Sequence, residues 1–142
     1  MVKFFTKEDE TQIIAAIEVA EKITSGEIRV HVQEHCRGKI LEDAARVFKA
    51  LKMDQTEQRN GVLIYIVPER NEFGVIGDKG INNLVPENYW DDVRDIIQQH
   101  FRAGNFGKGI EEAITKIGKK LQEHFPYQIG DVNELPDDIS YG

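Results

Sequence analysis

Three short segments of the chain place an oxygen-bearing side chain directly beside glycine. They are Gly26-Glu27, Asn60-Gly61 and Gly77-Asp78-Lys79-Gly80. Carboxylate and amide oxygens from separate segments are the ligands that hard divalent cations take in proteins. The glycines beside Asp78 would let the backbone approach a ligand closely. This pattern predicts a site for a divalent cation, Ca²⁺ or Mg²⁺, formed by Glu27, Asn60 and Asp78.

Each of these residues also has an interpretation without a ligand. Glu27 suits the first solvent-facing position of a strand, and Asn60 suits a turn that precedes a strand. Asp78 is able to form an Asx turn, although in a G-D-x-G loop its carboxylate is expected to be flexible and exposed. Asp91 and Asp92 come soon after it, and both fit the first turn of a helix, where carboxylates complement the helix dipole.

Hydrophobic periodicity predicts the elements that position these residues. Apolar residues at helical spacing predict helices around residues 13–23, 41–51, 89–101 and 110–121, with Thr6 and Asp9 as an approximate capping box before the first and Pro86 opening the third. Strands are predicted at residues 27–33, 61–67 and 72–76. The turn at residues 68–71 is short, so the last two strands are expected to form a hairpin.

This order of elements predicts where the three glycine-containing segments meet. If the first two strands are parallel and joined through a helix, both begin at the same end of the sheet. The third strand runs back against the second, so it brings Asp78 to that end as well. Glu27, Asn60 and Asp78 are therefore expected on one rim. The predicted fold class is α/β, a three-layer sandwich with a central mixed sheet and helices on both faces.

The first predicted strand shows strict alternation of polar and apolar residues. Its polar positions are Glu27, Arg29, His31 and Gln33, and its apolar positions are Ile28, Val30 and Val32. Alternation of this kind is typical of a strand with one buried face and one wet face. We therefore expect this strand to lie near an edge of the sheet.

The composition limits the classes of protein to be considered. The chain has 142 residues, 40% of them hydrophobic, and a net charge of −7, which indicates one globular domain at residues 1–126 with an acidic tail at 127–142. An acidic chain is a poor general binder of the nucleic-acid backbone. It contains no signal-peptide-like segment and no apolar run of membrane-spanning length. We expect a cytoplasmic protein that binds neither nucleic acid nor membrane, with a tail that is either docked or frayed.

Other motifs for chemistry are weak. The four histidines, His31, His35, His100 and His124, show no metal-ligand spacing. The G-D-K-G-I segment lacks the Lys-Ser/Thr pair of a phosphate-binding P-loop, and no G-x-S-x-G nucleophile motif is present. Cys36 is the single cysteine, so an intramolecular disulfide is excluded, and we interpret it as a thiol without a catalytic role.

Several motifs, in order along the chain, resemble the TPM domain family. They are A-I-x-x-A-E-x-x-T-S-G-E-I-R-V from Ala16, R-N-G-V-L-I-Y-I from Arg59, G-D-K-G-I from Gly77, and Trp90 followed by F-R-x-G-x-x-x-x-G-I from Phe101. The family includes thylakoid-lumen, photosystem II repair and acetylcholine-receptor modulator proteins. The resemblance covers roughly residues 4–126. It implies an α/β sandwich and a divalent-cation site near the glycine loops, to which Glu27, Asn60 and Asp78 correspond.

The resemblance also implies two kinds of function. Acid phosphatase activity has been attributed to a plant member, whereas other members act as accessory proteins in assembly or repair. The first hypothesis is a soluble accessory domain that binds Ca²⁺ or Mg²⁺ and a protein partner. The alternative is a metal-dependent acid phosphatase, with Asp78 as ligand or base and Arg59 or Lys79 facing the phosphate, although the chain lacks a phosphatase nucleophile motif. A third hypothesis is an interaction module that uses the acidic tail as its contact surface.

Overall fold

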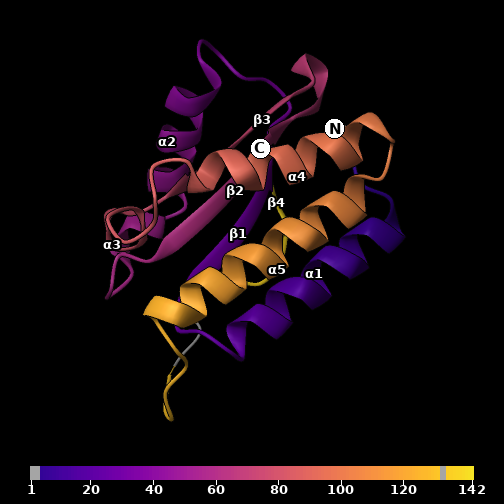
Figure 1. Cartoon of the computed structure of the whole chain (residues 1–142). Helices are drawn as coiled ribbons and strands as arrows, with labels where there is room; N and C mark the ends of the chain where they lie inside the picture. Colours follow the sequence, from indigo (N-terminus) through magenta and orange to yellow (C-terminus); the bar gives the residue numbers. More distant parts are fainter. Residues whose placement is uncertain (1–3, 132–133) are drawn as a thin grey trace.

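The computed structural model describes residues 4–131 and 134–142 (Figure 1). The predicted domain and tail also include residues 1–3 and 132–133, which lie outside the described residues. The helices and strands are α1 (Lys7–Glu21), β1 (Glu27–Val32), α2 (Ile40–Ala50), β2 (Gly61–Val67), β3 (Glu72–Gly77), α3 (Lys79–Asn82), α4 (Tyr89–Arg102), α5 (Phe106–His124) and β4 (Ser140–Tyr141), with short 3-10 turns η1 (Met53–Gln55) and η2 (Pro68–Arg70).

The strands of the described chain form one mixed sheet in the order β3-β2-β1-β4. β1 and β2 are parallel, with Glu27 opposite Gly61, and β2 and β3 are antiparallel, with Val62 opposite Gly77. The predicted parallel pair and the predicted hairpin are therefore both confirmed. The register places the starts of β1 and β2 and the end of β3 at one edge of the sheet. We call this edge, with residues 26–27, 60–61 and 77–78, the rim.

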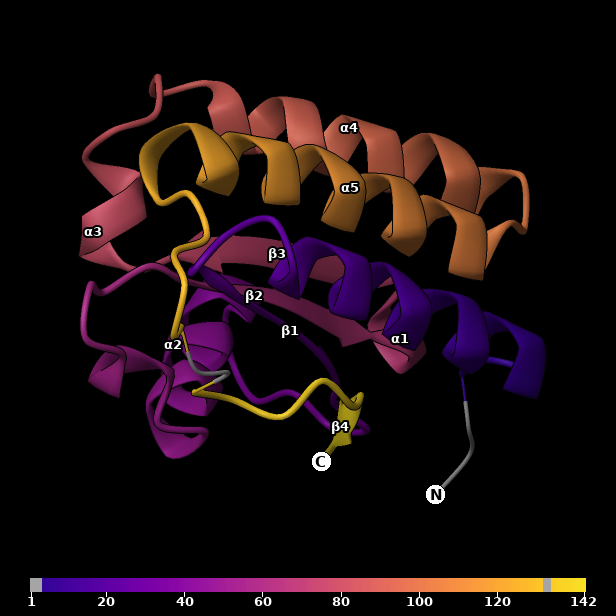
Figure 2. The ribbon, with the colours of Figure 1, turned by 90° about the horizontal axis from the view of Figure 1, so that it is seen from below.

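Helices cover both faces of the sheet, which confirms the predicted three-layer sandwich. Alternate residues of β2 face opposite layers, since strand side chains alternate. Val62, Ile64 and Ile66 pack with α1, α4 and α5, and Leu63, Tyr65 and Val67 pack with α2. Figure 2 shows α1, α4 and α5 on one side of the strands, with α2 and the yellow C-terminal segment on the other.

The first helix begins as its sequence predicts. Thr6 accepts a hydrogen bond from the Asp9 amide at 3.0 Å, and the Asp9 carboxylate accepts one from the Thr6 amide at 3.1 Å, completing a capping box. Further along, α1 packs closely on α5. A Cβ at Gly118 would lie 3.1 Å from the Ala20 Cβ, so a small residue at each position allows the two helices to approach.

Two predictions in the segment after β3 were wrong. The third long helix does not open at Pro86, because α4 begins at Tyr89 and Pro86 lies in the preceding turn, where its carbonyl accepts from the Tyr89 amide at 3.0 Å. The segment expected to be a loop over residues 77–85 contains α3, with Asp78 as its N-cap. A proline disfavours the helical conformation in the residue before it, so Pro86 separates α3 from α4.

β1 lies near an edge of the described sheet, as predicted, because the two-residue strand β4 is the last strand beside it. The prediction that β1 has a wet face was wrong. Glu27, Arg29 and His31 are 6%, 6% and 5% exposed. The C-terminal segment covers them, and β4 pairs with β1 at His31 and Val32. The tail is thus docked where the structure describes it. Polar alternation could not show this, because the covering segment comes more than 100 residues later in the chain.

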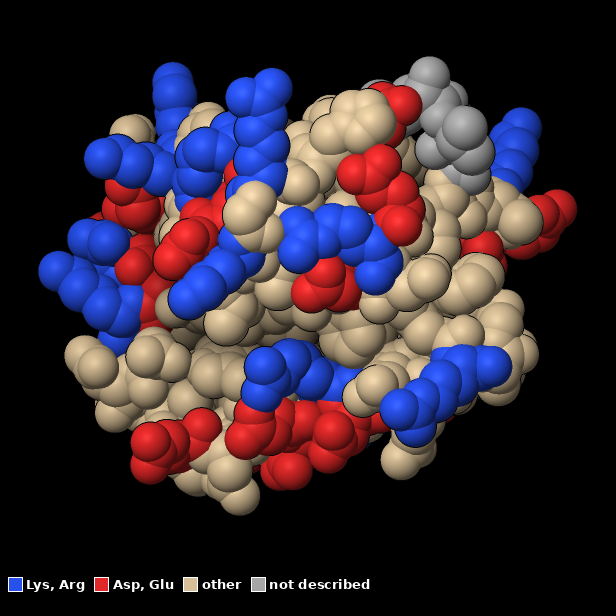
Figure 3. Space-filling model, turned by 90° about the horizontal axis from the view of Figure 1, so that it is seen from above, with Lys and Arg blue, Asp and Glu red and all other residues tan. Residues whose placement is uncertain are grey.

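Two features of the surface bear on the choice of partners. None of the helices in the described part of the chain is both long and apolar enough to cross a lipid bilayer. On the face shown in Figure 3, Lys and Arg side chains lie interleaved with Asp and Glu side chains. That face therefore carries no broad patch of a single charge.

Candidate cation site at the rim

The backbone brings the three predicted site residues together at the rim. The Glu27 amide donates to the Asn60 carbonyl at 3.4 Å, and the Asp78 amide donates to the Gly61 carbonyl at 2.8 Å. Both contacts follow from the strand register, because Gly61 lies opposite Glu27 on one side and next to the end of β3 on the other. The topology inferred from the sequence was correct on this point. The side chains, however, have separate surroundings.

The Asp78 carboxylate is held by neighbouring protein groups. Arg59 donates to it through Nε at 2.6 Å and through Nη2 at 3.0 Å, and the Lys79 amide donates to its Oδ1 at 2.8 Å. Asp78 is only 8% exposed, so the expectation of a flexible, exposed carboxylate was wrong. A paired carboxylate at the N-cap of a helix is a stable arrangement in its own right. Asp78 stays a predicted cation ligand, but its carboxylate would have to release Arg59 before it could bind a metal ion.

Gly80 explains why the G-D-K-G segment ends in glycine. A Cβ at this position would lie 2.2 Å from the Gln58 carbonyl oxygen and 2.4 Å from the Arg59 carbonyl oxygen. The Gly80 amide also donates to the Arg59 carbonyl at 2.8 Å. The close approach that the sequence suggested is therefore made to the protein's own backbone. It fixes α3 against the segment that enters β2.

Asn60 lies in the most enclosed part of the rim. The residue is 1% exposed, and neither its side-chain oxygen nor its side-chain nitrogen has a hydrogen-bond partner among the described residues. Burying an amide without partners costs roughly 1–3 kcal/mol, so such groups usually contact an ion or an ordered water. The Asn60 oxygen is therefore suited to a cation ligand, as predicted from the sequence.

Glu27 is a buried carboxyl group with no cationic partner among the described residues. It is 6% exposed, and its Oε1 accepts from the Glu134 amide at 2.8 Å. Burial raises the pKa of Glu27 from an ordinary 4.5 to about 7, against the lowering effect of that hydrogen bond, and the nearby charges of Glu134, Glu21 and Asp137 raise it further. A neighbouring cation would relieve this conflict.

Glu27 lines a cavity of about 360 Å³ between the end of α1, the start of β1 and the beginning of the tail. Its lining consists of Glu18, Glu21, Lys22, Thr24, Ser25, Gly26, Glu27, Tyr127 and Asp131. A hydrogen bond with Asp137 raises the pKa of Glu21 to about 7, and burial and nearby acidic groups act in the same direction. Four carboxyl groups thus line the cavity with one lysine.

Sequence reasoning missed Glu21, although α1 offered a signal. Acidic residues near a helix C-terminus oppose the helix dipole, and α1 ends with Glu18 and Glu21 and has no basic residue in its last turn. Among residues 4–131 and 134–142, no three His, Cys, Asp or Glu side chains are already grouped as the ligands of a metal ion.

The order of motifs and the fold agree with one protein family. A family model of the TPM domain matches residues 1–120. The chain belongs to the TPM domain family. The resemblance stated from its motifs is confirmed.

Solved structures share the fold of this TPM domain. The NMR structure of the BA42 protein from the psychrophilic bacterium Bizionia argentinensis is 45% identical, with a TM-score of 0.92, over 100% of this chain and 98% of that chain. The N-terminal domain of cg2496 from Corynebacterium glutamicum is 15% identical, with a TM-score of 0.64, over 82% of this chain and 73% of that one. The N-terminal domain of a P. gingivalis protein is 16% identical, with a TM-score of 0.65, over 87% of this chain and 82% of that one. The last two show the fold alone. No protein with a curated function matches significantly.

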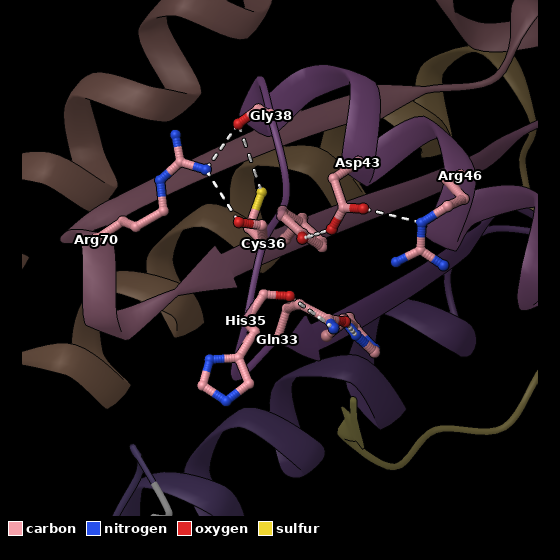
Figure 4. Close-up of polar contacts among 9 residues, drawn as sticks. Gln33, His35, Cys36, Gly38, Asp43, Arg46 and Arg70 are labelled. Carbon is pink, nitrogen blue, oxygen red and sulfur yellow. Dashed lines mark hydrogen bonds and ion pairs between the residues drawn. The ribbon is translucent and has the colours of Figure 1, made fainter.

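The TPM domain has a second polar cluster at the opposite end of β1 and β2 (Figure 4). Asp43 on α2 accepts from the buried Tyr65 hydroxyl and, at 2.8 Å, from Arg46 Nε. Arg70 donates to the Gly38 carbonyl at 2.7 Å, which ties the loop before α2 to the hairpin. Burial raises the Tyr65 pKa far above its ordinary value. The paired groups in this cluster stabilise the loop, and none of them requires a ligand.

Proposed function

We propose that this TPM domain binds a divalent cation, Ca²⁺ or Mg²⁺, at the rim, and that it acts as an accessory domain. The observation that carries the proposal is the buried Glu27 carboxyl group, which faces the acidic cavity with Glu21 and has a pKa of about 7. A cation in this cavity would favour the ionised forms of both residues and remove their mutual repulsion.

The available groups fit a hard cation. Ca²⁺ takes six to eight oxygen ligands and tolerates irregular geometry, and Mg²⁺ keeps several waters beside one or two carboxylates. Glu27 and Glu21 would hold the ion through carboxylate oxygens, with Asp131 on the same cavity wall. The backbone carbonyl of Asn60 accepts a hydrogen bond from the Glu27 amide, and the side-chain oxygen of Asn60 has no partner among the described residues. Asp78 would bind the ion only if Arg59 released it.

Calorimetric titration and thermal melts with CaCl₂ and MgCl₂ test the proposal. Wild-type protein should show binding heat and a rise in melting temperature, since a ligand at 100 times its Kd stabilises the folded state by about 2.7 kcal/mol. Glu27→Gln should lose most of this response. Glu87→Gln, the same chemical change at an exposed position, should keep it.

The same experiment separates the two parts of the rim. If Asp78→Asn loses the response and Glu27→Gln keeps it, the ion binds at Asp78 and the cavity is not its site. If wild-type protein shows neither heat nor a melting shift at millimolar metal, the proposal of a cation site fails altogether.

The phosphatase alternative has less support. Arg59, which was expected to face a phosphate, is engaged by Asp78, and Lys79 is an exposed residue at the start of α3. We therefore propose a binding role rather than catalysis. A cytoplasmic location and a protein partner stay predictions.

A further inference from the structure

The C-terminal residues 134–142, which we call the tail segment, are held by alternate side chains of β1. The contacts are Glu27 Oε1 with the Glu134 amide at 2.8 Å, Arg29 Nη2 with Asp138 Oδ1 at 3.3 Å, and His31 Nδ1 with Ser140 Oγ at 2.6 Å. Leu135 and Ile139 add apolar anchors that are 9% and 7% exposed. Leu135 packs in the core on the α2 side of the sheet, and Ile139 packs in the core on the α1 side. The polar face of β1 therefore recognises an extended segment by charge, hydrogen bonds and one apolar contact, while Ile139 anchors the segment on the other side of the sheet.

Arg29 is incompletely satisfied by this arrangement. Its side chain is 8% exposed, and Asp138, whose side chain is 70% exposed, contacts it only through Nη2. The Arg29 Nε is buried and has no hydrogen-bond partner among the described residues. A buried guanidinium is usually paired, and its Nε and Nη2 together match the two oxygens of one carboxylate. The tail segment leaves half of that recognition unused.

The attachment of the tail segment is also limited. Of the six residues of β1, β4 pairs with His31 and Val32. Glu134 lies near Glu27, and Asp137 shares a hydrogen bond with the Glu21 carboxyl group, so acidic groups of the tail face acidic groups of the domain. Like charges oppose docking at neutral pH. The tail segment thus covers a recognition surface that it fits imperfectly.

We propose that the polar face of β1 is a docking site for an extended segment of a partner protein that carries one carboxylate opposite Arg29 and displaces the tail segment. The partner strand would pair with the edge of β1 by main-chain hydrogen bonds. Its apolar side chains would replace Leu135 and Ile139, and an Asp or Glu would bind both Nε and Nη2 of Arg29. The tail segment is the internal competitor. A tethered competitor acts at an effective concentration on the order of millimolar, so it weakens the apparent affinity of any partner.

Fluorescence anisotropy with a labelled synthetic peptide tests this proposal. The peptide has the sequence of residues 134–142 and is titrated against full-length proteins. Leu135→Ala/Asp138→Ala weakens the internal competitor and leaves β1 intact, so it should bind the peptide at least about tenfold more tightly than wild type does. Adding Arg29→Gln to this variant should remove the gain. A peptide with Asn in place of Asp138 should bind the tail variant as weakly as the original peptide binds the variant with Arg29→Gln added. Equal binding by wild type and the tail variant, or binding that is indifferent to Arg29→Gln, would overturn the proposal.

Hydrogen exchange on the wild-type protein gives a test that needs no variant. The Gly142 amide donates to the Val32 carbonyl at 2.9 Å in the docked tail. Millimolar unlabelled peptide should speed exchange of this amide and leave amides of α5 unchanged. Unchanged Gly142 exchange would show that the tail segment is not replaceable. A wild-type dimer in solution that the peptide dissociates would identify a second copy of this chain as the occupant and overturn the assignment to a different protein.

Discussion

Replacing Glu27 with glutamine should remove the pH dependence that this residue gives to the stability of the protein. In the folded protein the Glu27 pKa is about 7, against an ordinary 4.5. The folded state therefore binds this proton more tightly than the unfolded state does. The stabilisation is fully present below pH 4.5 and is lost as pH rises through 7. The substituted glutamine side chain is always neutral, and it keeps an oxygen that can accept from the Glu134 amide.

The size of the effect follows from the two pKa values. The difference between 4.5 and about 7 corresponds to at most roughly 3 kcal/mol in the free energy of unfolding, since one pKa unit equals about 1.4 kcal/mol. Glu27→Gln should therefore match wild type near pH 4.5 and exceed it by up to about 3 kcal/mol at pH 8. For a domain of this size, each kcal/mol raises the melting temperature by roughly 2–5 °C.

Urea denaturation followed by circular dichroism at pH 4.5, 6, 7 and 8, in chelator, measures this difference. Other titrating groups are common to both proteins, so they largely cancel when the two curves are subtracted. Removing the Glu27 charge should also lower the Glu21 pKa slightly, because the two carboxyl groups repel each other. Glu87→Gln serves as the control and should follow wild type at every pH. Parallel curves for wild type and Glu27→Gln, or a less stable variant at pH 8, would refute this account of Glu27.

Three further predictions concern the rim and the tail. Asp78→Asn should lose about 1–2 kcal/mol of unfolding free energy in urea denaturation, because Arg59, which is half-exposed, loses its charged partner while the helix cap is kept. A loss no larger than that of the exposed control Asp92→Asn would contradict the pairing. Gly80→Ala should lower the free energy of unfolding more than Gly104→Ala does, because it places a Cβ 2.2 Å from a backbone oxygen. Gly104→Ala meets only a φ of +79° in open space, which costs roughly 1–2 kcal/mol. Equal losses would rule out the steric argument. Burial lowers the pKa of His31 below 6.5, so its neutral form stabilises the folded state above pH 6.5, and this contribution is lost as pH falls through the folded pKa. His31→Gln should therefore flatten the dependence of stability on pH below pH 6.5. An unchanged slope would show that His31 does not titrate on unfolding.

The sequence by itself determined the four long helices, the first three strands and the topology of those strands. The capping box at Thr6, the apolar periodicity of the helices, and the unbroken apolar run of β2 are local patterns, and each formed as predicted. The short turn after Val67 made the hairpin the simplest connection, and a parallel crossover then required Glu27, Asn60 and Asp78 to meet at one rim. Backbone position follows from such local rules because strand register is set by period and turn length.

Only the tertiary structure decided the environment of each side chain. Asp78 was expected to be exposed, but Arg59 lies 19 residues earlier and reaches it because β2 and β3 pair. Glu27, Arg29 and His31 were expected to be wet, but the tail segment, more than 100 residues later, covers them. The same long-range contact brings Asp137 beside Glu21 and raises the pKa values at the cavity. Burial and charge depend on groups that are distant in sequence, so periodicity along one segment cannot determine them.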